Sequence, residues 1–171
     1  MTPIDLAALL LRGIVGFTML AHGWNHVFGG GKLAGTERWF ASLGFRQARF
    51  QALVASYGEL MFGTLLILGL LTPLAAAGVF GTMTVAFVSN HRPNGYFIFR
   101  PGEGYEYVLA LAVVAAALGA LGGGGWSLDD AVGFDADGWA GLAIVVGVGG
   151  LGAAWTLAAF WRPERPDRSP G

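Results

Sequence analysis

The chain has 171 residues, of which 54% are hydrophobic and only 12% are charged, and its mean hydropathy is +0.58. These values lie outside the range of ordinary soluble domains and indicate a protein that crosses a membrane several times. The net charge is −1 and the chain has no cysteine, which excludes disulfides, thiolate metal sites and thiol–disulfide catalysis.

Five apolar stretches are candidates for membrane-spanning helices, each of which needs about 20 residues. They are residues 4–27, 50–71, 73–89, 105–121 and 139–161. The third stretch has the least margin, and it follows the second through Pro73, a residue that can end one helix and begin the next. The sequence therefore predicts an all-α, polytopic membrane protein with a four-helix bundle and a fifth, C-terminal transmembrane helix.

The first apolar stretch carries three polar side chains that stand out. Arg12 lies inside it, and His22 and His26 are four residues apart near its end. At about 100° per residue, Arg12 and His26 fall on one stripe of the helix, and His22 lies within a quarter turn of that stripe. We expect the stripe to face the interior of the bundle, because ionisable groups are costly in contact with lipid.

Two carboxylates on later stretches can meet this stripe. Glu59 lies about 12 Å in from the start of the second stretch, and Glu106 lies at the start of the fourth. We expect an Arg12–Glu59 pair, which either fixes the helix register or serves a ligand.

A metal site is the weaker interpretation of the histidines. Four groups would share one depth in the membrane: His22, His26, His91 and Glu106. Histidines at i and i+4 also arise by chance, and the HExxH pattern is absent. We therefore favour hydrogen bonding near the membrane interface and predict no metal site.

The charges predict an orientation in the membrane. With five crossings, nine of the ten basic residues fall on the side of the 28–50 loop, the 90–104 loop and the tail. The positive-inside rule then places the N-terminus outside and the C-terminus in the cytoplasm, in a multi-pass protein of the plasma (inner) membrane. The 28–50 loop alternates aromatic and basic residues, so we expect it to lie in the membrane interface.

Three regions are expected along the chain. Residues 1–130 form the four-helix membrane domain, residues 131–161 an outer acidic loop and the additional helix, and residues 162–171 a disordered cytoplasmic tail. Small residues at fourfold spacing on the last two helices predict close helix contacts, either within the bundle or, for the ladder on the fifth span, with a partner subunit. These two ladders are Ala112, Ala116 and Ala120, and Gly150, Ala154 and Ala158.

Five segments in order carry a family resemblance: "RG…AHGWNHVFGGG", "FASLGF", "GELMFGTLLILGLLTPLAA", "GYFIFRPGEGYEYVLALA" and "GGGGWSLDD". Over residues 10–130 they resemble the DoxX family of bacterial integral membrane proteins, of the actinobacterial type. The resemblance implies a four-helix membrane bundle, so the fifth helix suggests an added docking element. It also implies that the family's recurrent polar positions are Arg12, His22, Gly23, Glu59 and Glu106, whereas His26 stands where many relatives carry lysine.

The resemblance further implies a redox setting. The related DoxD branch is associated with thiosulfate:quinone oxidoreductase, and actinobacterial members with a membrane oxidoreductase complex that contains a sulfurtransferase and a superoxide dismutase. The expected partners are the lipid bilayer and other membrane or redox subunits, and no nucleic acid is expected.

Two functions stay open from the sequence. In the first, a quinone headgroup lies between the first, second and fourth spans, with Glu59, His22 and Glu106 as catalytic groups. The residues expected to hold the quinone are Arg12, His22, His26, Glu59 and Glu106.

In the second, the chain is a non-catalytic assembly or docking subunit for a partner oxidoreductase, so the sequence does not decide whether it is an enzyme. It has no covalent haem, iron–sulfur or flavin motif with which to carry electrons alone. Small-molecule transport is less favoured, since no inverted repeat is evident.

Overall fold

The computed structural model describes residues 2–163, and this range is helical apart from turns, loops and one isolated β-bridge. Its elements in chain order are α1 (Pro3–Phe28), α2 (Lys32–Ser42), α3 (Ala48–Leu68), α4 (Thr72–Ala86), the π-helix η1 (Phe87–His91), the 3-10 turn η2 (Arg92–Asn94), α5 (Glu106–Leu121), α6 (Leu128–Val132) and α7 (Gly138–Phe160). The tail predicted from residue 162 lies, from residue 164 onward, outside the described residues.

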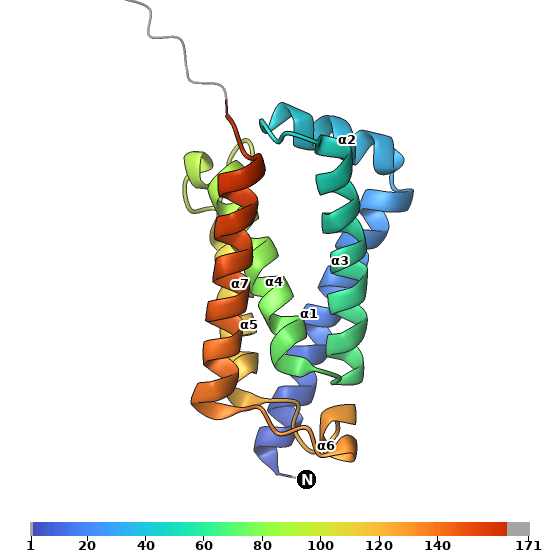
Figure 1. Cartoon of the computed structure of the whole chain (residues 1–171), viewed down its shortest axis with the longest axis vertical. Helices are drawn as coiled ribbons and strands as arrows, with labels where there is room; N and C mark the ends of the chain where they lie inside the picture. Colours follow the sequence, from blue (N-terminus) through green and yellow to red (C-terminus); the bar gives the residue numbers. More distant parts are fainter. Residues whose placement is uncertain (1, 164–171) are drawn as a thin grey trace, which may run out of the picture.

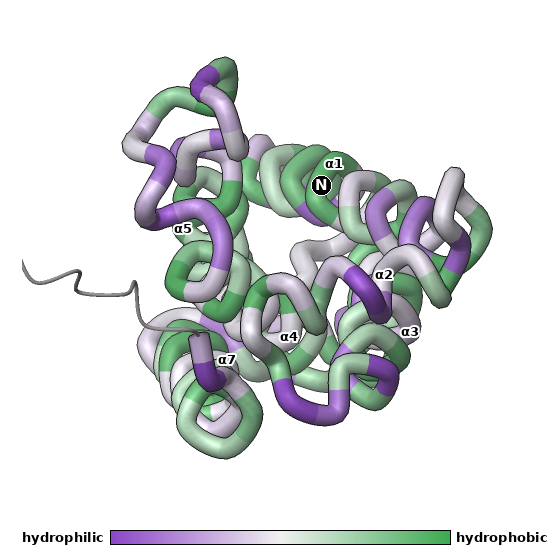
Figure 2. The backbone as a smooth tube through the Cα atoms, turned by 90° about the horizontal axis from the view of Figure 1, so that it is seen from above, coloured by the Kyte–Doolittle hydropathy of each residue, from purple (hydrophilic) through white to green (hydrophobic). Residues whose placement is uncertain are grey.

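Five helices run side by side, with α4 between α3 and α7 (Figures 1 and 2). Four of them are long and apolar enough to cross a membrane: α1, α3, α4 with its continuation to Asn94, and α7. The all-α, multi-pass prediction is therefore confirmed. Helix α4 has 15 residues and α5 has 16, but η1 and η2 continue α4 to Asn94, so α5 is the shortest of the five continuous helical segments.

Local sequence signals account for the helix ends that matter for the site. Thr2 and Asp5 form a capping box at the start of α1, where Pro3 occupies the first turn. Gly69 ends α3 with a φ of +64°, a conformation that glycine adopts without strain. Pro73 lies in the first turn of α4, as the sequence predicts.

Glycines set the distance between the packed helices. A Cβ added to Gly16 of α1 would lie 2.7 Å from the carbonyl oxygen of Gly63 on α3. In the same way, a Cβ on Gly149 of α7 would lie 2.5 Å from the carbonyl oxygen of Ala77 on α4. Small residues thus allow backbone contact between helices, which is the main source of helix association inside a membrane.

The predicted small-residue ladder on α7 does not face its own bundle. The buried stripe of this helix is Gly141, Val145, Gly149 and Ala153. Ala154 and Ala158 are exposed, and a Cβ on Gly150 would meet open space. Two neighbouring rows of small residues have the same spacing, and only the position of α4 decides which row is buried.

Hydrogen bonds join the C-terminal end of α7 to the turn between α2 and α3. Phe45, in the turn between α2 and α3, pairs with Trp161 in the β-bridge. The indole of Trp161 donates to the carbonyl oxygen of Leu43 at 2.9 Å. The backbone N–H of Arg46 donates to the carbonyl oxygen of Phe160 at 2.8 Å. One face of α7 packs on α4 and α5, and the opposite face is exposed at Leu151 and Trp155.

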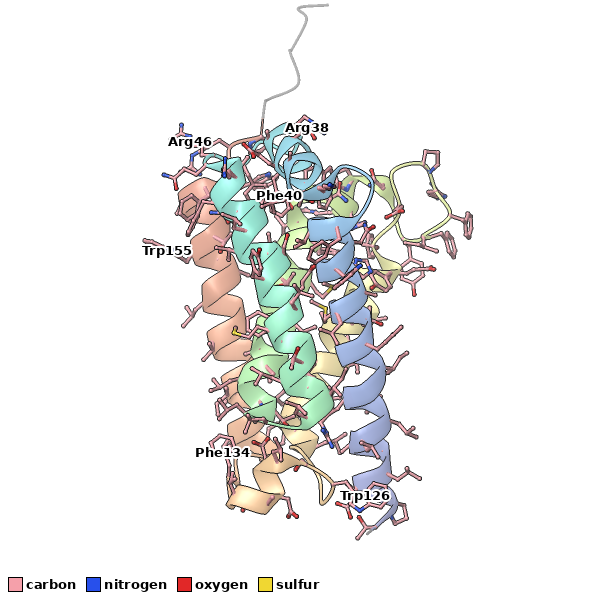
Figure 3. All side chains as sticks on the ribbon, turned by 90° about the vertical axis from the view of Figure 1, so that its right-hand side faces the viewer. Arg38, Phe40, Arg46, Trp126, Phe134 and Trp155 are labelled. Carbon is pink, nitrogen blue, oxygen red and sulfur yellow. The ribbon has the colours of Figure 1, made fainter. Side chains whose placement is uncertain are left out.

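The two ends of the bundle carry opposite charges. Arg38 and Arg46 lie at the end covered by α2 (Figure 3). The opposite end, which Trp126 and Phe134 mark in the same view, holds the acidic residues of α6 and of the start of α1: Asp5, Asp129 and Asp130. The loop after η2 and the end of α7 share the first end, and the N-terminus shares the second (Figure 1). We call them the α2 end and the α6 end. The structure thus groups the basic loops as the five-span prediction requires.

Candidate functional site

A cavity of about 740 Å³ lies toward the α2 end, between α3, α4 and α7. Apolar side chains form most of its lining. Gly78 and Gly81 of α4 lie along its floor, and Phe40 and Leu43 of the α2 segment cover its end.

The cavity overlaps the position predicted from the sequence, between the first, second and fourth spans (α1, α3 and α5), because α1 contributes His22 and His26 and α3 contributes Glu59. Both α4 and α7 supply walls, whereas α5 contributes only Tyr107 and Val108.

A buried imidazole–carboxylate pair lies in the cavity wall. Nδ1 of His26 is 3.2 Å from Oε2 of Glu59, and the two side chains are only 15% and 5% exposed. Neither of these two atoms has a hydrogen-bond partner of good geometry within the described range. Both atoms are also inaccessible to solvent, so the two residues contact the cavity through their other atoms.

Helix geometry explains how the two side chains meet. Gly23 of α1 packs against the carbonyl oxygen of Ser56 on α3, where a Cβ would lie at 2.8 Å. The chain reverses direction through α2, so α1 and α3 are antiparallel (Figure 1). Side chains lean toward the N-terminus of their own helix. His26 and Glu59, each three residues past this contact, therefore lean toward each other.

His22 lines the same cavity, one helical turn before His26. Its Nε2 is 2.9 Å from the hydroxyl of Tyr107 on α5, and the two rings stack with their centroids 5.7 Å apart. The sequence analysis did not identify Tyr107. This contact links α1 to α5 and holds one imidazole apart from the His26–Glu59 pair.

The π-helix η1 brings three more polar residues to the cavity: Ser89, Asn90 and His91. Nδ1 of His91 donates to the backbone carbonyl oxygen of Glu103 at 2.9 Å, and Nε2 is 3.3 Å from the amide nitrogen of Asn90. With a carbonyl as the partner of Nδ1, the ring keeps its proton there and accepts at Nε2. Single π turns are frequent at functional sites, and the sequence analysis did not predict this one.

Arg12 does not contact Glu59, so the predicted pair is wrong. The guanidinium is fully buried, and its Nη1 donates to the carbonyl oxygens of Leu66 at 3.0 Å and Ile67 at 3.3 Å. Its Nη2 donates to the carbonyl oxygen of Trp126 at 2.6 Å. The last carbonyls of a helix lack partners within that helix and attract cations, and this explains why Arg12 turns to the end of α3.

Asp129 completes this arrangement from the first turn of α6. Its carboxylate accepts from the backbone N–H groups of Leu71 at 2.6 Å and Thr72 at 2.8 Å, at the start of α4. Its own N–H donates to the carbonyl oxygen of Gly69 at 2.8 Å. Asp129 is buried. We call Arg12, Asp129 and residues 69–72 the α6-end node.

Three of the five predicted site residues line the cavity: His22, His26 and Glu59. Arg12 belongs to the α6-end node, and Glu106 is half-buried at the first turn of α5, outside the lining. Within residues 2–163, no three histidine or acidic side chains gather closely enough to hold a metal ion. Gln51, a buried polar residue in the second apolar stretch, also lines the cavity and was missed, although its polarity was a signal.

One comparison with known proteins gives a match. A family model with the description DoxX matches residues 7–92, which is half of the chain and runs from α1 to the start of η2. The matched stretch includes His22, His26, Glu59 and His91. Neither the curated proteins nor the solved structures gave a match.

Proposed function

Because the chain belongs to the DoxX family of membrane proteins, we propose that it is the membrane subunit of a redox or respiratory-chain-associated complex and binds a quinone headgroup in the cavity. The proposal places it in the plasma (inner) membrane with five crossings, its N-terminus outside and its α2 end in the cytoplasm. Support for this orientation comes from the basic residues of the α2 end.

The observation that carries the proposal is the His26–Glu59 pair in the wall of an apolar cavity. Ligand sites for small molecules are mostly apolar and contain a few converging polar groups. A quinone headgroup matches this composition, since it is a flat apolar ring with carbonyl oxygens that accept hydrogen bonds. A protonated His26 donates to a quinone carbonyl through Nε2. Its other nitrogen, Nδ1, then holds a proton that faces the carboxylate of Glu59.

The polar groups of the cavity also suit proton transfer. A bound quinone accepts two electrons and two protons when it becomes a quinol. Imidazole and carboxylate are the usual proton donors for such a step, and in this cavity His26 and Glu59 supply them. The chain has no cysteine, so in this proposal the electrons come from a reduced flavin or metal centre of a partner subunit.

A binding experiment tests this function without the partner. The full chain is purified into lipid nanodiscs and titrated with a tail-less benzoquinone by calorimetry. We expect Glu59→Gln to weaken binding at least tenfold, a loss of about 1.4 kcal/mol. Glu106→Gln is the matched control, because Glu106 lies outside the cavity lining and its replacement leaves binding unchanged. Equal affinity of the Glu59→Gln protein and the wild type overturns the proposal.

A docking function is the second candidate, and α7 is the observation that favours it. This helix lies beyond the part of the chain that matches the family, and its outer face exposes Leu151 and Trp155. A partner helix could pack there through van der Waals contact. Gentle solubilisation followed by size analysis tests this function, since recovery of the chain as an isolated monomer counts against it.

A further inference from the structure

The cavity has an open side between α3 and α7. Both helices pack extensively on α4, and they make little contact with each other. Toward the α2 end the rings of Phe50 and Phe160 are 6.1 Å apart, and Phe45 and Trp161, just beyond the two helices, form the β-bridge. A slot therefore remains between α3 and α7 below this closure. Figure 1 shows the separation of the two ribbons, and the lining residues identify it as part of the cavity.

Several residues line the cavity and are exposed on the outer surface as well. On α3 these are Val54, Tyr57 and Met61, which are 52%, 55% and 52% exposed. On α7 the corresponding residue is Val148, which is 55% exposed. Because α3 and α7 are both long and apolar enough to cross a membrane, this opening faces the hydrocarbon region of the bilayer.

The cavity combines a few charged and histidine groups with a mostly apolar slot. His26, Glu59 and the η1 residues supply its charged and histidine groups, whereas the α3 and α7 walls of the slot are mostly apolar side chains and glycine, with Gln51, Tyr57 and Thr156 as polar members. From Gln51 to Met61 the slot extends about 15 Å along α3, at 1.5 Å per residue. Phe40 and Leu43 cover the α2 end. The shape thus suits an amphiphile with a polar head and a long apolar tail that enters from the side.

We propose that the slot between α3 and α7 holds the isoprenoid tail of a membrane quinone, which enters the cavity laterally from the bilayer; this rests on the function proposed above. The buried carboxylate argues against a phospholipid as the occupant. A phospholipid would bring its anionic phosphate toward Glu59, and like charges at short range repel strongly in a medium of low dielectric constant. A quinone headgroup is neutral and brings no such charge.

Gly152 gives a way to close the slot without disturbing the fold. It lies on α7, lines the cavity, and has no heavy atom within 4 Å of the position where a Cβ would be. Gly152→Phe therefore places a ring in the slot. Gly147→Phe is the matched control, because Gly147 lies on the same helix in equally open space but outside the cavity lining.

The experiment compares two ligands in nanodiscs, a tail-less benzoquinone and the same headgroup with a long isoprenoid tail. We expect Gly152→Phe to weaken binding of the tailed quinone at least tenfold and to leave the tail-less one unchanged, whereas Gly147→Phe changes neither. Unchanged affinity of the Gly152→Phe protein for the tailed quinone overturns the inference. So does a phospholipid that copurifies with the wild type and is lost from the Gly152→Phe protein.

The same titrations separate this inference from the proposed function. If the wild type binds neither quinone, both fail. If the tail-less quinone binds in a Glu59-dependent way but Gly152→Phe has no effect on the tailed one, only the tail site fails. Thermal unfolding of each variant shows that the fold is intact before binding is compared.

Discussion

Two regions of this molecule bury ionisable side chains, and they differ in how those side chains are satisfied. In the α6-end node, Arg12 donates to three backbone carbonyls and Asp129 accepts from two backbone N–H groups. At the cavity, His26 Nδ1 and Glu59 Oε2 face each other without a hydrogen bond of good geometry. Within residues 2–163, each region also buries two polar atoms without a hydrogen-bond partner: Nε of Arg12 and Oγ1 of Thr72 in the node, and Nδ1 of His26 and Oε2 of Glu59 at the cavity. The difference is that the charged groups of the node bind backbone atoms, whereas those of the second region face each other in the wall of a cavity.

This difference separates a structural role from a binding role. A buried charge that is hydrogen-bonded to the backbone of several segments fixes the chain around it, and its removal leaves those partners unpaired. A buried polar pair in the wall of an apolar cavity is instead placed where it can contact a ligand. Buried charge alone, which is all that the sequence reveals, does not distinguish the two roles.

The largest expected effect comes from removing the guanidinium of the α6-end node. Arg12→Ala removes the hydrogen bonds to the carbonyl oxygens of Leu66, Ile67 and Trp126, of which Leu66 keeps its bond from the N–H of Gly69, and it empties the space of a fully buried side chain. We expect the free energy of unfolding to fall by roughly 3 kcal/mol, since lost hydrogen bonds and a cavity both destabilise the fold. Thermal unfolding in detergent measures the loss. Arg38→Ala, at an exposed position on α2, serves as the control, and an equal effect of both changes contradicts the structural role.

A smaller loss is expected on the acidic side of the same node. Asp129→Ala removes the acceptor for two N–H groups at the start of α4, a loss comparable to that of a helix cap, or about 1–2 kcal/mol. Asp130→Ala is the neighbouring control, because Asp130 is exposed, and it should change stability by no more than about 0.5 kcal/mol. Chemical denaturation compares the two. If they unfold at the same denaturant concentration, the contrast between the two regions is lost.

The smallest effect on stability is expected at the cavity. Glu59→Gln keeps the shape of the side chain and removes a buried charge, so the lost attraction to His26 is offset by a lower desolvation cost. We expect the free energy of unfolding to change by less than about 1 kcal/mol while quinone affinity falls. Unfolding curves recorded on the protein used for binding check this. A destabilisation as large as that of Arg12→Ala would make the pair structural.

Hydropathy alone predicted much of the fold. The apolar stretches place the long helices correctly, and Pro73 marks the start of α4. Helical periodicity on α1 also predicted that Arg12 and His26 point inward, and both are at least partly buried. These features depend on residues near each other in the chain, where periodicity is informative.

Helical periodicity and hydropathy could not predict which residues the buried groups contact. Arg12 binds residues 66, 67 and 126, which lie far away in the sequence, and the position of the end of α3 beside Arg12 could not be predicted in advance. The wall formed by α7 depends on which of two small-residue rows contacts α4. The division of the chain at residue 130 stays a prediction.

The most direct test of the central claim is to locate a bound quinone chemically. A photoreactive quinone is activated in membranes that contain the full chain, and the labelled peptides are identified by mass spectrometry. The account predicts adducts on α3 within residues 51–61 and on α7 within residues 148–156, with labelling reduced by Glu59→Gln. Adducts near the α6-end node, or labelling spread evenly over the lipid-facing surface and indifferent to Glu59, would contradict it.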